Sequence, residues 1–394
     1  MYNIKIEDFI NITDIKTSFD INDLVHICKR KNNAKRDYLF VNRYQGKHVP
    51  AAPSKIISLF DEFVNEVKKN INKSERILVV GFAETATGIA EYLTYSLASN
   101  KEYQKSVVYH LQTTREPIVG CDKLISFSEE HSHATNQELY SKNILPKYDR
   151  VLFVEDEITT GKTILNFINE FKKLNPDCSY SVASILNWQN EENIKIFNDN
   201  NIQRIYLVSG MIKENVPSID IPTIEAEDLY SKDYFKNTEY PVFHINHNGI
   251  ENARMGVYSS NYNHGFESIY NGYTKKMLSL IEPTDKIMVI GTEEFMFYPL
   301  MIANDIATYF GAEVKYRATT RSPISCNNEK EYEIKDSIMI PSAYDASRKT
   351  FLYNMKGDYN KIIVISDTDM THEFKSAMMA YCSEHGKQFW AVQL

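Results

Sequence analysis

The stretch VLFVEDEITTGKT, residues 151–163, decides the fold of this 394-residue chain. Its opening apolar run is typical of a strand that is buried on both faces of a parallel sheet. The strand ends in Glu155 and Asp156, at the edge where open parallel sheets bind ligands. Residues 159–163 then lead into ILNFINEFKKL, whose apolar residues have helical spacing. We therefore expect a loop at a helix N-terminus, where unpaired backbone N–H groups favour an anion.

The composition of this loop selects the kind of anion. Gly161 lets the backbone approach a phosphate closely, and Thr159, Thr160 and Thr163 add hydroxyl donors. A nucleoside-triphosphate loop is excluded, because it needs a glycine five positions before Gly161, where this chain has Asp156. A ribose 5-phosphate fits better, since its phosphate can lie on the loop while its 2′- and 3′-hydroxyls reach the two carboxylates.

Residues 151–163 resemble the 5-phosphoribosyl 1-pyrophosphate (PRPP) motif of type I phosphoribosyltransferases, of the orotate phosphoribosyltransferase-like kind. That motif is a hydrophobic strand, an acidic pair and a T-x-G-x-T loop. The resemblance implies that Glu155 and Asp156 are the catalytic pair that holds the ribose hydroxyls. It also implies that Mg²⁺ arrives bound to PRPP, without direct protein ligands. The 5-phosphate would be cradled by Thr159, Thr160, Gly161, Lys162 and Thr163.

Two further loops follow from the same resemblance. A pyrophosphate loop is expected after the first core strand, where GFAETATGIA (81–90) stands. Its lining would be Glu84, Thr85, Ala86 and Thr87. A lid is expected between residues 113 and 142, from which Arg115 would meet pyrophosphate and Glu129, His131 and His133 would order the closed state.

Short apolar runs, each followed by a turn and a helix-like segment, predict parallel strands joined by crossover helices. The second half repeats the first in order, and the sixmer T-T-R-x-P-I occurs at residues 113–118 and 319–324. We therefore predict an α/β fold, a type I phosphoribosyltransferase sheet with a hood, followed by a second, degenerate α/β copy. The expected strands are RILVVG (76–81), SVVYHL (106–111), RVLFVED (150–156), SYSVASIL (179–186), RIYLVSG (204–210), KIMVIG (286–291), EVKYRA (313–318) and KIIVISD (361–367).

The predicted domain order is a hood at 1–75, a phosphoribosyltransferase core at 76–215, a linker at 216–250 and a C-terminal domain at 251–394. The whole chain resembles bacterial proteins that pair such a core with a domain named after the tetrapeptide T-R-S-P, which residues 320–323 spell here. That group is associated with tellurium-resistance and stress gene clusters. In the second copy the phosphate loop is lost, and Arg321 and Asp367 are its best polar candidates.

Composition excludes several function classes. The net charge of −8, from 44 basic and 52 acidic residues, disfavours a surface that follows a nucleic-acid backbone. The N-terminus lacks the pattern of a signal peptide, and no apolar run is long enough to cross a bilayer, so we expect a cytoplasmic protein. The five scattered cysteines suggest neither disulfides nor a zinc site. Monomer and homodimer both stay open.

The expected function is transfer of ribose 5-phosphate from PRPP to a nitrogenous base, with release of pyrophosphate. The alternatives are a non-catalytic PRPP- or nucleotide-binding regulator and a tandem enzyme similar to PRPP synthetase. The acceptor stays open among purines, pyrimidines and unusual nitrogen bases. Its recognition is expected from the hood, in which NRYQGKHVP supplies Arg43, Tyr44, Lys47 and His48.

Overall fold

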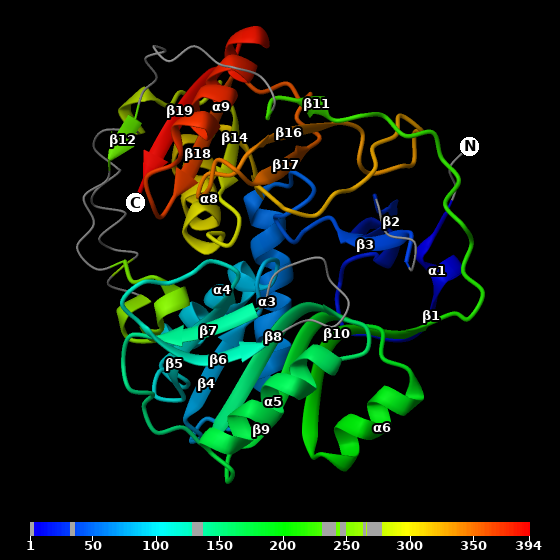
Figure 1. Cartoon of the computed structure of the whole chain (residues 1–394), viewed down its shortest axis with the longest axis vertical. Coiled ribbons are helices and arrows are strands. Elements are labelled where there is room, and N and C mark those ends of the chain that lie inside the picture. The colour runs from blue at the N-terminus through cyan, green and yellow to red at the C-terminus, as the bar shows by residue number, and fades with distance from the viewer. Residues whose placement is uncertain are drawn as a thin grey trace.

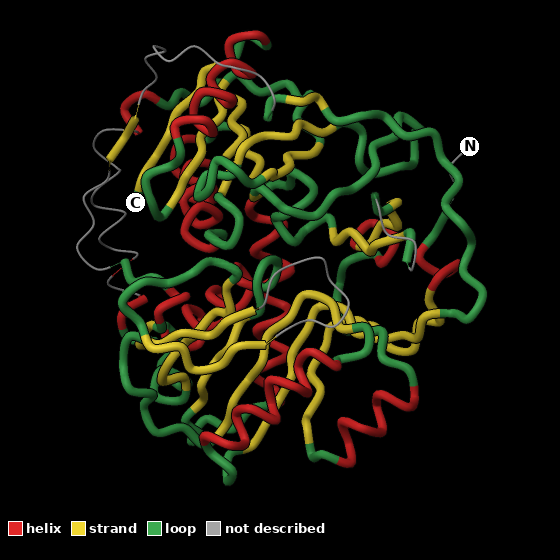
Figure 2. Tube along the Cα trace, in the orientation of Figure 1, coloured by secondary structure: helices red, strands yellow, loops and turns green. Residues whose placement is uncertain are grey.

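The computed structural model describes residues 4–31, 36–127, 137–230, 242–244, 250–262, 265 and 278–394. Two large sheets, one in each half of the chain, organise the described residues, and a three-stranded sheet and a two-stranded hairpin accompany them (Figures 1 and 2). One hydrophobic core runs through both halves, with Phe60 and Leu93 from the first half and Phe297 and Leu300 from the second in the same cluster. The two halves therefore fold against each other.

The first half contains helices α1 (Ile6–Phe9), α2 (Ile21–Leu24), α3 (Pro53–Asn70), α4 (Thr87–Ala98), α5 (Lys162–Leu174) and α6 (Glu191–Asp199). Its strands are β1 (Ile10–Ile15), β2 (Val25–Lys29), β3 (Tyr38–Asn42), β4 (Ile77–Gly81), β5 (Val107–Thr114), β6 (Asp122–Phe127), β7 (Gln137–Ser141), β8 (Arg150–Ile158), β9 (Ser179–Asn187) and β10 (Ile202–Ile212).

The second half contains helices α8 (Phe297–Phe310) and α9 (His372–Glu384) and the 3₁₀ turns η1 (Ala253–Met255) and η2 (Leu278–Leu280). Its strands are β11 (Glu227–Asp228), β12 (Val242–His244), β13 (Val257–Tyr258), β14 (Lys286–Gly291), β15 (Glu313–Ala318), β16 (Ser337–Pro341), β17 (Lys349–Tyr353), β18 (Lys361–Ser366) and β19 (Gln388–Gln393).

The first sheet has a parallel centre in the order β10-β9-β8-β4-β5. Every strand predicted for this half is present, within a few residues of the expected bounds. Helices α3 and α4 cover one face of the sheet and α5 and α6 the other (Figure 1). The predicted helical spacing of α5 is confirmed, because its buried residues are Ile164, Phe167, Ile168 and Phe171.

The N-terminal segment pairs with strands of both halves of the molecule. Strand β1 joins the first sheet antiparallel to β10, while β2 and β3 form a separate hairpin. Ala51 forms a bridge with Tyr316 of β15, and Arg30 forms one with Ile324. In the other direction, β13 pairs with β5 of the first sheet. Contacts thus cross each of the domain boundaries expected from the sequence. The boundaries themselves stay a prediction.

The second half contains a parallel sheet in the order β12-β19-β18-β14-β15 and a smaller sheet of β11, β16 and β17. The three strands predicted here, β14, β15 and β18, are confirmed. Their order, with β19, matches β9-β8-β4-β5 of the first sheet. The loops after β4 and β14 also share a hydrogen bond: Ala83 N donates to Thr113 Oγ1 at 2.8 Å, and Glu293 N donates to Thr319 Oγ1 at 2.9 Å. These matches support the proposed duplication.

The two halves meet at the loops that follow β4 and β14. Tyr95 of α4 packs against Phe297 of α8, with ring centroids 5.6 Å apart. The hydroxyl of Thr87 donates to the carbonyl of Glu294 at 2.8 Å. A Cβ at Gly88 would come within 3.0 Å of the Met296 Cβ, so the backbones approach closely here. In the described part of the chain, no helix combines the length and apolar character needed to cross a membrane.

Candidate active site

The carboxyl end of β8 carries the expected pair of acids, both partly exposed. The turn that follows places Gly161 at the N-cap of α5 with a φ of 76°, a left-handed conformation that favours glycine. A Cβ there would lie 2.5 Å from the ring of Phe197, so glycine is also required by space. Thr160 and Lys162 are exposed, and no side chain caps the helix. The start of α5 is therefore open to an anion from solvent.

Asp156 links this loop to the one that follows β4. Thr85 Oγ1 donates to Asp156 Oδ1 at 3.1 Å. The parallel pairing of β4 with β8 causes this contact, because both strands end at the same edge and Gly81 lies opposite Val154. Glu155 Oε1 accepts the backbone N–H of Asp156 at 3.2 Å. The structure thus brings together the predicted ribose-binding and pyrophosphate-binding segments.

Glu84 is 7% exposed and lies in an ion-paired network. Its Oε1 is 2.5 Å from Lys47 Nζ, and its Oε2 is 3.8 Å from Arg321 Nε. Burial works to raise the pKa of the Glu84 carboxyl, but the charges of Lys47 and Arg321 outweigh it and lower this pKa to about 2. Of the other predicted loop residues, Ala86 and Thr87 are fully buried, and Thr87 bonds toward the second half.

Arg115, at the end of β5, has a Nε that is buried without a hydrogen-bond partner among the described residues. Its backbone N–H donates to Glu294 Oε1 at 3.1 Å, while Thr114 Oγ1 donates to Glu294 Oε2 at 2.7 Å. The lid candidates Glu129, His131 and His133 lie outside the described residues. On either side of them, β6 and β7 form an antiparallel pair that extends β5.

A third carboxylate of β8, Glu157, was missed by the sequence analysis. Arg36 Nη2 donates to Glu157 Oε1 at 3.2 Å, and the Arg36 guanidinium also lies over the rings of Tyr38 and Phe40. Burial raises the pKa of Glu157 to about 7 despite this arginine. The alternation of side chains along the strand could have placed Glu157 and Glu155 on one face, but not its arginine partner.

His48, one of the hood candidates, is buried beside the site, and both of its ring nitrogens lack a hydrogen-bond partner among the described residues. Burial and the neighbouring Lys47 lower the pKa of His48 to about 4, so the imidazole is neutral at pH 7. Gln45 Nε2 donates to the carbonyl of Thr85 at 3.5 Å. The hydroxyl of Tyr44 and the guanidinium of Arg43 instead donate to the carboxylate of Asp23, which is not one of the predicted site residues.

The two candidates of the second half have different positions. Arg321 reaches the first half: it pairs with Glu116 and, at 2.6 Å, with Glu293, besides its contact with Glu84. Burial works to lower the pKa of Arg321, yet the surrounding carboxylates raise it, so its charge is secure. Arg348 joins the same acids, at 2.8 Å from Glu116 and 3.0 Å from Glu293. The loop after β14 and the T-R-S-P segment therefore pack against the loop after β4.

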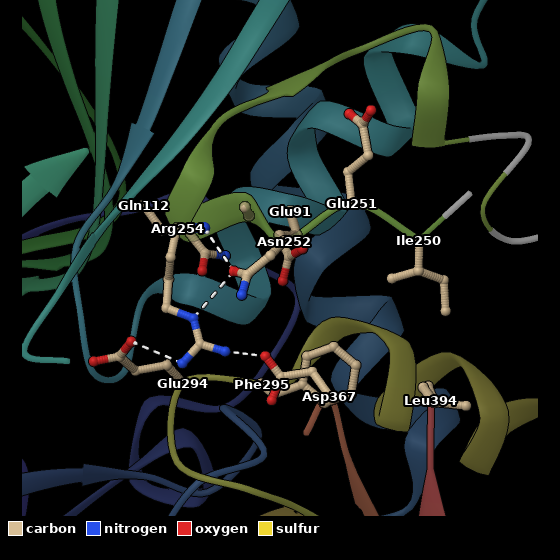
Figure 3. Close-up of a pocket in the computed structure, with 11 residues that line it drawn as sticks. Glu91, Gln112, Ile250, Glu251, Asn252, Arg254, Glu294, Phe295, Asp367 and Leu394 are labelled. Atoms are coloured by element: carbon tan, nitrogen blue, oxygen red, sulfur yellow. Dashed lines mark hydrogen bonds and ion pairs between the residues drawn. The ribbon is translucent and has the colours of Figure 1, made fainter. Parts of the chain in front are cut away.

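Asp367 pairs with Arg254 and accepts the hydroxyl of Tyr344 at 2.7 Å. Arg254 also lies 3.8 Å from Glu294, and Figure 3 shows its guanidinium between the two acids. Arg254, Glu294 and Asp367 border a small cavity of about 60 Å³, which Glu91 and Gln112 also line. Asp367, which the proposed duplication aligns with Asp156, is thus paired with an arginine of the same chain.

Two family models match the sequence. Residues 24–211 match the phosphoribosyl transferase family PRTase_2, and residues 251–381 match the TRSP domain that occurs C-terminal to it. No curated protein matches the sequence. Among the described residues, no group of three or more His, Cys, Asp or Glu side chains could hold a metal ion.

Several solved structures are similar over the first half. Adenine phosphoribosyltransferase from Saccharomyces cerevisiae is 13% identical over 47% of this chain and 94% of its own, with a TM-score of 0.32. The enzyme from Trypanosoma brucei is 15% identical over 47% and 76%, with a TM-score of 0.35. Orotate phosphoribosyltransferase from Aeropyrum pernix is 15% identical over 47% and 88%, with a TM-score of 0.31.

The family match confirms the expected α/β phosphoribosyltransferase fold in the N-terminal half, while the relation of the second sheet to the first stays a proposal. The chain therefore joins a domain of the phosphoribosyltransferase family, at residues 24–211, to a C-terminal TRSP domain at residues 251–381.

Proposed function

We propose that the chain transfers ribose 5-phosphate from PRPP to a nitrogenous base and releases pyrophosphate. One observation carries the proposal: the contact between Asp156 and Thr85 sets the acidic pair beside the loop after β4, next to an open helix N-terminus. A ribose that carries a 5-phosphate and a 1-pyrophosphate needs these three features side by side.

Each segment has one task in this proposal. Residues 159–163 hold the 5-phosphate through backbone N–H groups and threonine hydroxyls. Glu155 and Asp156 accept hydrogen bonds from the 2′- and 3′-hydroxyls. PRPP enters as its magnesium complex, in which phosphate oxygens of PRPP supply the oxygen donors that magnesium prefers.

The chemical step separates positive from negative charge, and charged side chains of this protein stabilise both in the transition state. Positive charge develops on the ribose as its bond to pyrophosphate breaks, and the two carboxylates of β8 stabilise it. Arg115 lies at the end of β5 with an unpaired buried Nε, so it can donate to the departing pyrophosphate. The lid segment excludes water from the site, so that a nitrogen of the base, and not water, forms the new bond to C1 of the ribose as pyrophosphate leaves.

The direct test is to incubate the full chain with PRPP, magnesium and a panel of purine, pyrimidine and other nitrogen bases. Pyrophosphate release and the mass of the nucleotide product are measured. We expect release that depends on one class of base and a product heavier than the base by ribose 5-phosphate. PRPP with magnesium but no base is the control for hydrolysis.

Two results would overturn the proposal in different ways. PRPP that binds but stays intact with every base would identify a non-catalytic regulator. PRPP formed from ATP and ribose 5-phosphate would identify an enzyme similar to PRPP synthetase.

A further inference from the structure

A second, larger cavity of about 660 Å³ lies between the N-terminal segment and the second half. It is formed by the start of β15, the loop between β17 and β18, the residues around β16 and the hood residues Val49 and Pro50. The candidate active site is at the carboxyl end of β8, and none of its residues lines this cavity. Its volume is within the range of small-molecule sites.

The lining is positively charged, although the chain as a whole is acidic. Four cationic side chains, Arg43, Lys315, Lys335 and Lys356, face two acids, Glu333 and Asp336. Both acids are already engaged. Glu333 accepts Arg43 through two bonds, of 3.1 and 2.9 Å, and Asp336 Oδ1 accepts the backbone N–H of Met355 at 2.7 Å. Glu333 is thus paired with Arg43, whereas Asp336 keeps its negative charge, so the four cations exceed the two acids of the lining by two positive charges.

The lysines differ in what they contact. The ammonium group of Lys335 donates to backbone carbonyls, at 2.9 Å in the case of Lys330. Among the described residues, Lys315 and Lys356 have no carboxylate within ion-pair distance. Two cations thus reach the same cavity without a counterion from the described chain.

Arg317 adds a third cation behind the cavity wall. It follows Lys315 by two positions on β15, so both side chains leave the same face of the sheet. It is fully buried, and Nη2 donates to the carbonyl of His48 at 3.2 Å. Its Nε and Nη1 have no hydrogen-bond partner among the described residues. The cavity residues Tyr359 and Asp336 are among its electrostatic neighbours.

A buried guanidinium without a paired carboxylate is costly, and an anion in the adjacent cavity would compensate for it. We infer that this cavity binds an organic phosphate of mononucleotide size, with the phosphate directed to Lys315 and Lys356, while the buried charge of Arg317 acts on it from behind the wall. The ring of Tyr359 and the amide of Asn328 supply contacts for the rest of the ligand. The inference stands apart from the proposed transferase chemistry.

The test is isothermal titration calorimetry of the full chain with AMP, adenosine and inorganic phosphate as probes. We expect AMP to bind and adenosine to bind at least tenfold more weakly, because the charge-assisted hydrogen bonds need the phosphate. Equal affinity for AMP and adenosine would overturn the inference.

A charge-matched pair of variants locates the site. The double variant Lys315→Ala, Lys356→Ala should lose AMP affinity by roughly tenfold for each charge removed. Lys101→Ala, Lys105→Ala removes two exposed lysines of the first half and should bind AMP as the unmodified chain does. Pyrophosphate release should be the same in both. Loss of AMP binding in Asp156→Asn, with the Lys315, Lys356 variant unchanged, would overturn the inference and leave the proposed function standing.

Arg317→Met tests whether the buried charge behind the cavity wall contributes to ligand binding. Methionine keeps much of the volume and removes an uncompensated buried charge, so we expect equal or higher thermal stability with at least tenfold weaker AMP binding. A lower melting temperature with unchanged AMP affinity would contradict the role of Arg317. If this variant fails to fold, the lysine variants still decide the matter.

Discussion

At the residue scale, Asp156 is the most informative position. It is partly exposed, and among the described residues its carboxylate accepts one hydrogen bond, from Thr85, so its side chain is available to a ligand. We expect Asp156→Asn to lower pyrophosphate release by about 10² to 10³, the usual cost of one transition-state contact. Its melting temperature should change little, since surface substitutions usually alter stability by less than ~0.5 kcal/mol. Asp177→Asn, at an exposed aspartate near the end of α5, is the matched control.

Glu91 gives a prediction about pH. Its carboxyl is buried beside Tyr262 and Gln112, and burial raises its pKa from the usual 4.5 to about 7. The folded state therefore holds a proton that the unfolded chain loses between these values, and the free energy of unfolding falls as pH rises through this window. At about 1.36 kcal/mol for each pH unit, the full effect is roughly 3 kcal/mol.

Glu91→Gln should remove this term. We expect the variant to be more stable than the unmodified chain at pH 8 and similar to it near pH 4.5, as measured by urea denaturation at both values. A difference in stability that is the same at the two pH values would show that the carboxyl does not titrate in this window.

The residues that the sequence could identify are those whose surroundings are local. Asp156 and Gly161 are fixed by one strand, one turn and one helix, all within a short stretch. The partners of Glu84 come from distant parts of the chain, Lys47 in the hood and Arg321 in the TRSP domain. No local pattern encodes such contacts, so the ion-paired state of Glu84 could not be predicted.

At the element scale, the parallel strands were predictable because each is a short apolar run buried on both faces, as in β4 and β18. The β16–β17 pair was not predicted. Its strands lie in a separate small sheet, and their partly polar sequences, SIMIP and KTFLY, lack a long apolar run. Strand β19, QFWAVQ, was missed although it is apolar, because no matching unit of the first half was identified for it.

The turn between β8 and α5 depends on Gly161, for which Gly120 is a natural control. Both have positive φ, 76° and 80°, but only Gly161 has a neighbour, Phe197, in the space that a Cβ would take. Alanine at Gly120 should cost about 1 kcal/mol from backbone strain alone. Gly161→Ala should cost more and should also weaken PRPP binding, because the loop must shift. Thermal unfolding and PRPP titration of both variants measure this; equal effects would mean that the Phe197 contact is unimportant.

At the scale of the whole molecule, the two halves share one hydrophobic core, and ion pairs join them. The TRSP domain is therefore part of the surroundings of the candidate active site. Residues of the second half meet the pyrophosphate loop at Glu84 and the end of β5 at Thr114. The proposed duplication explains this, since matching loops of two related sheets would then face each other. The short apolar runs of the strands predict each sheet, but they do not predict how the two sheets are placed relative to each other.

Arg321 tests whether this contact matters for turnover. It lies 3.8 Å from Glu84 and also pairs with Glu116 and Glu293, whereas Arg348 pairs with those last two acids and has no ion pair with Glu84. We expect Arg321→Gln to lower kcat/KM for PRPP by about 10 to 10², because a cation beside the loop proposed to bind pyrophosphate is lost. Arg348→Gln should destabilise the interface to a similar degree but leave kcat/KM within about twofold. Steady-state kinetics and melting temperatures of the two variants separate the effects. Of these two arginines, only Arg321 contacts the loop proposed to bind the leaving group. Equal losses of activity in the two variants would therefore mean that Arg321 acts only by holding the two halves together.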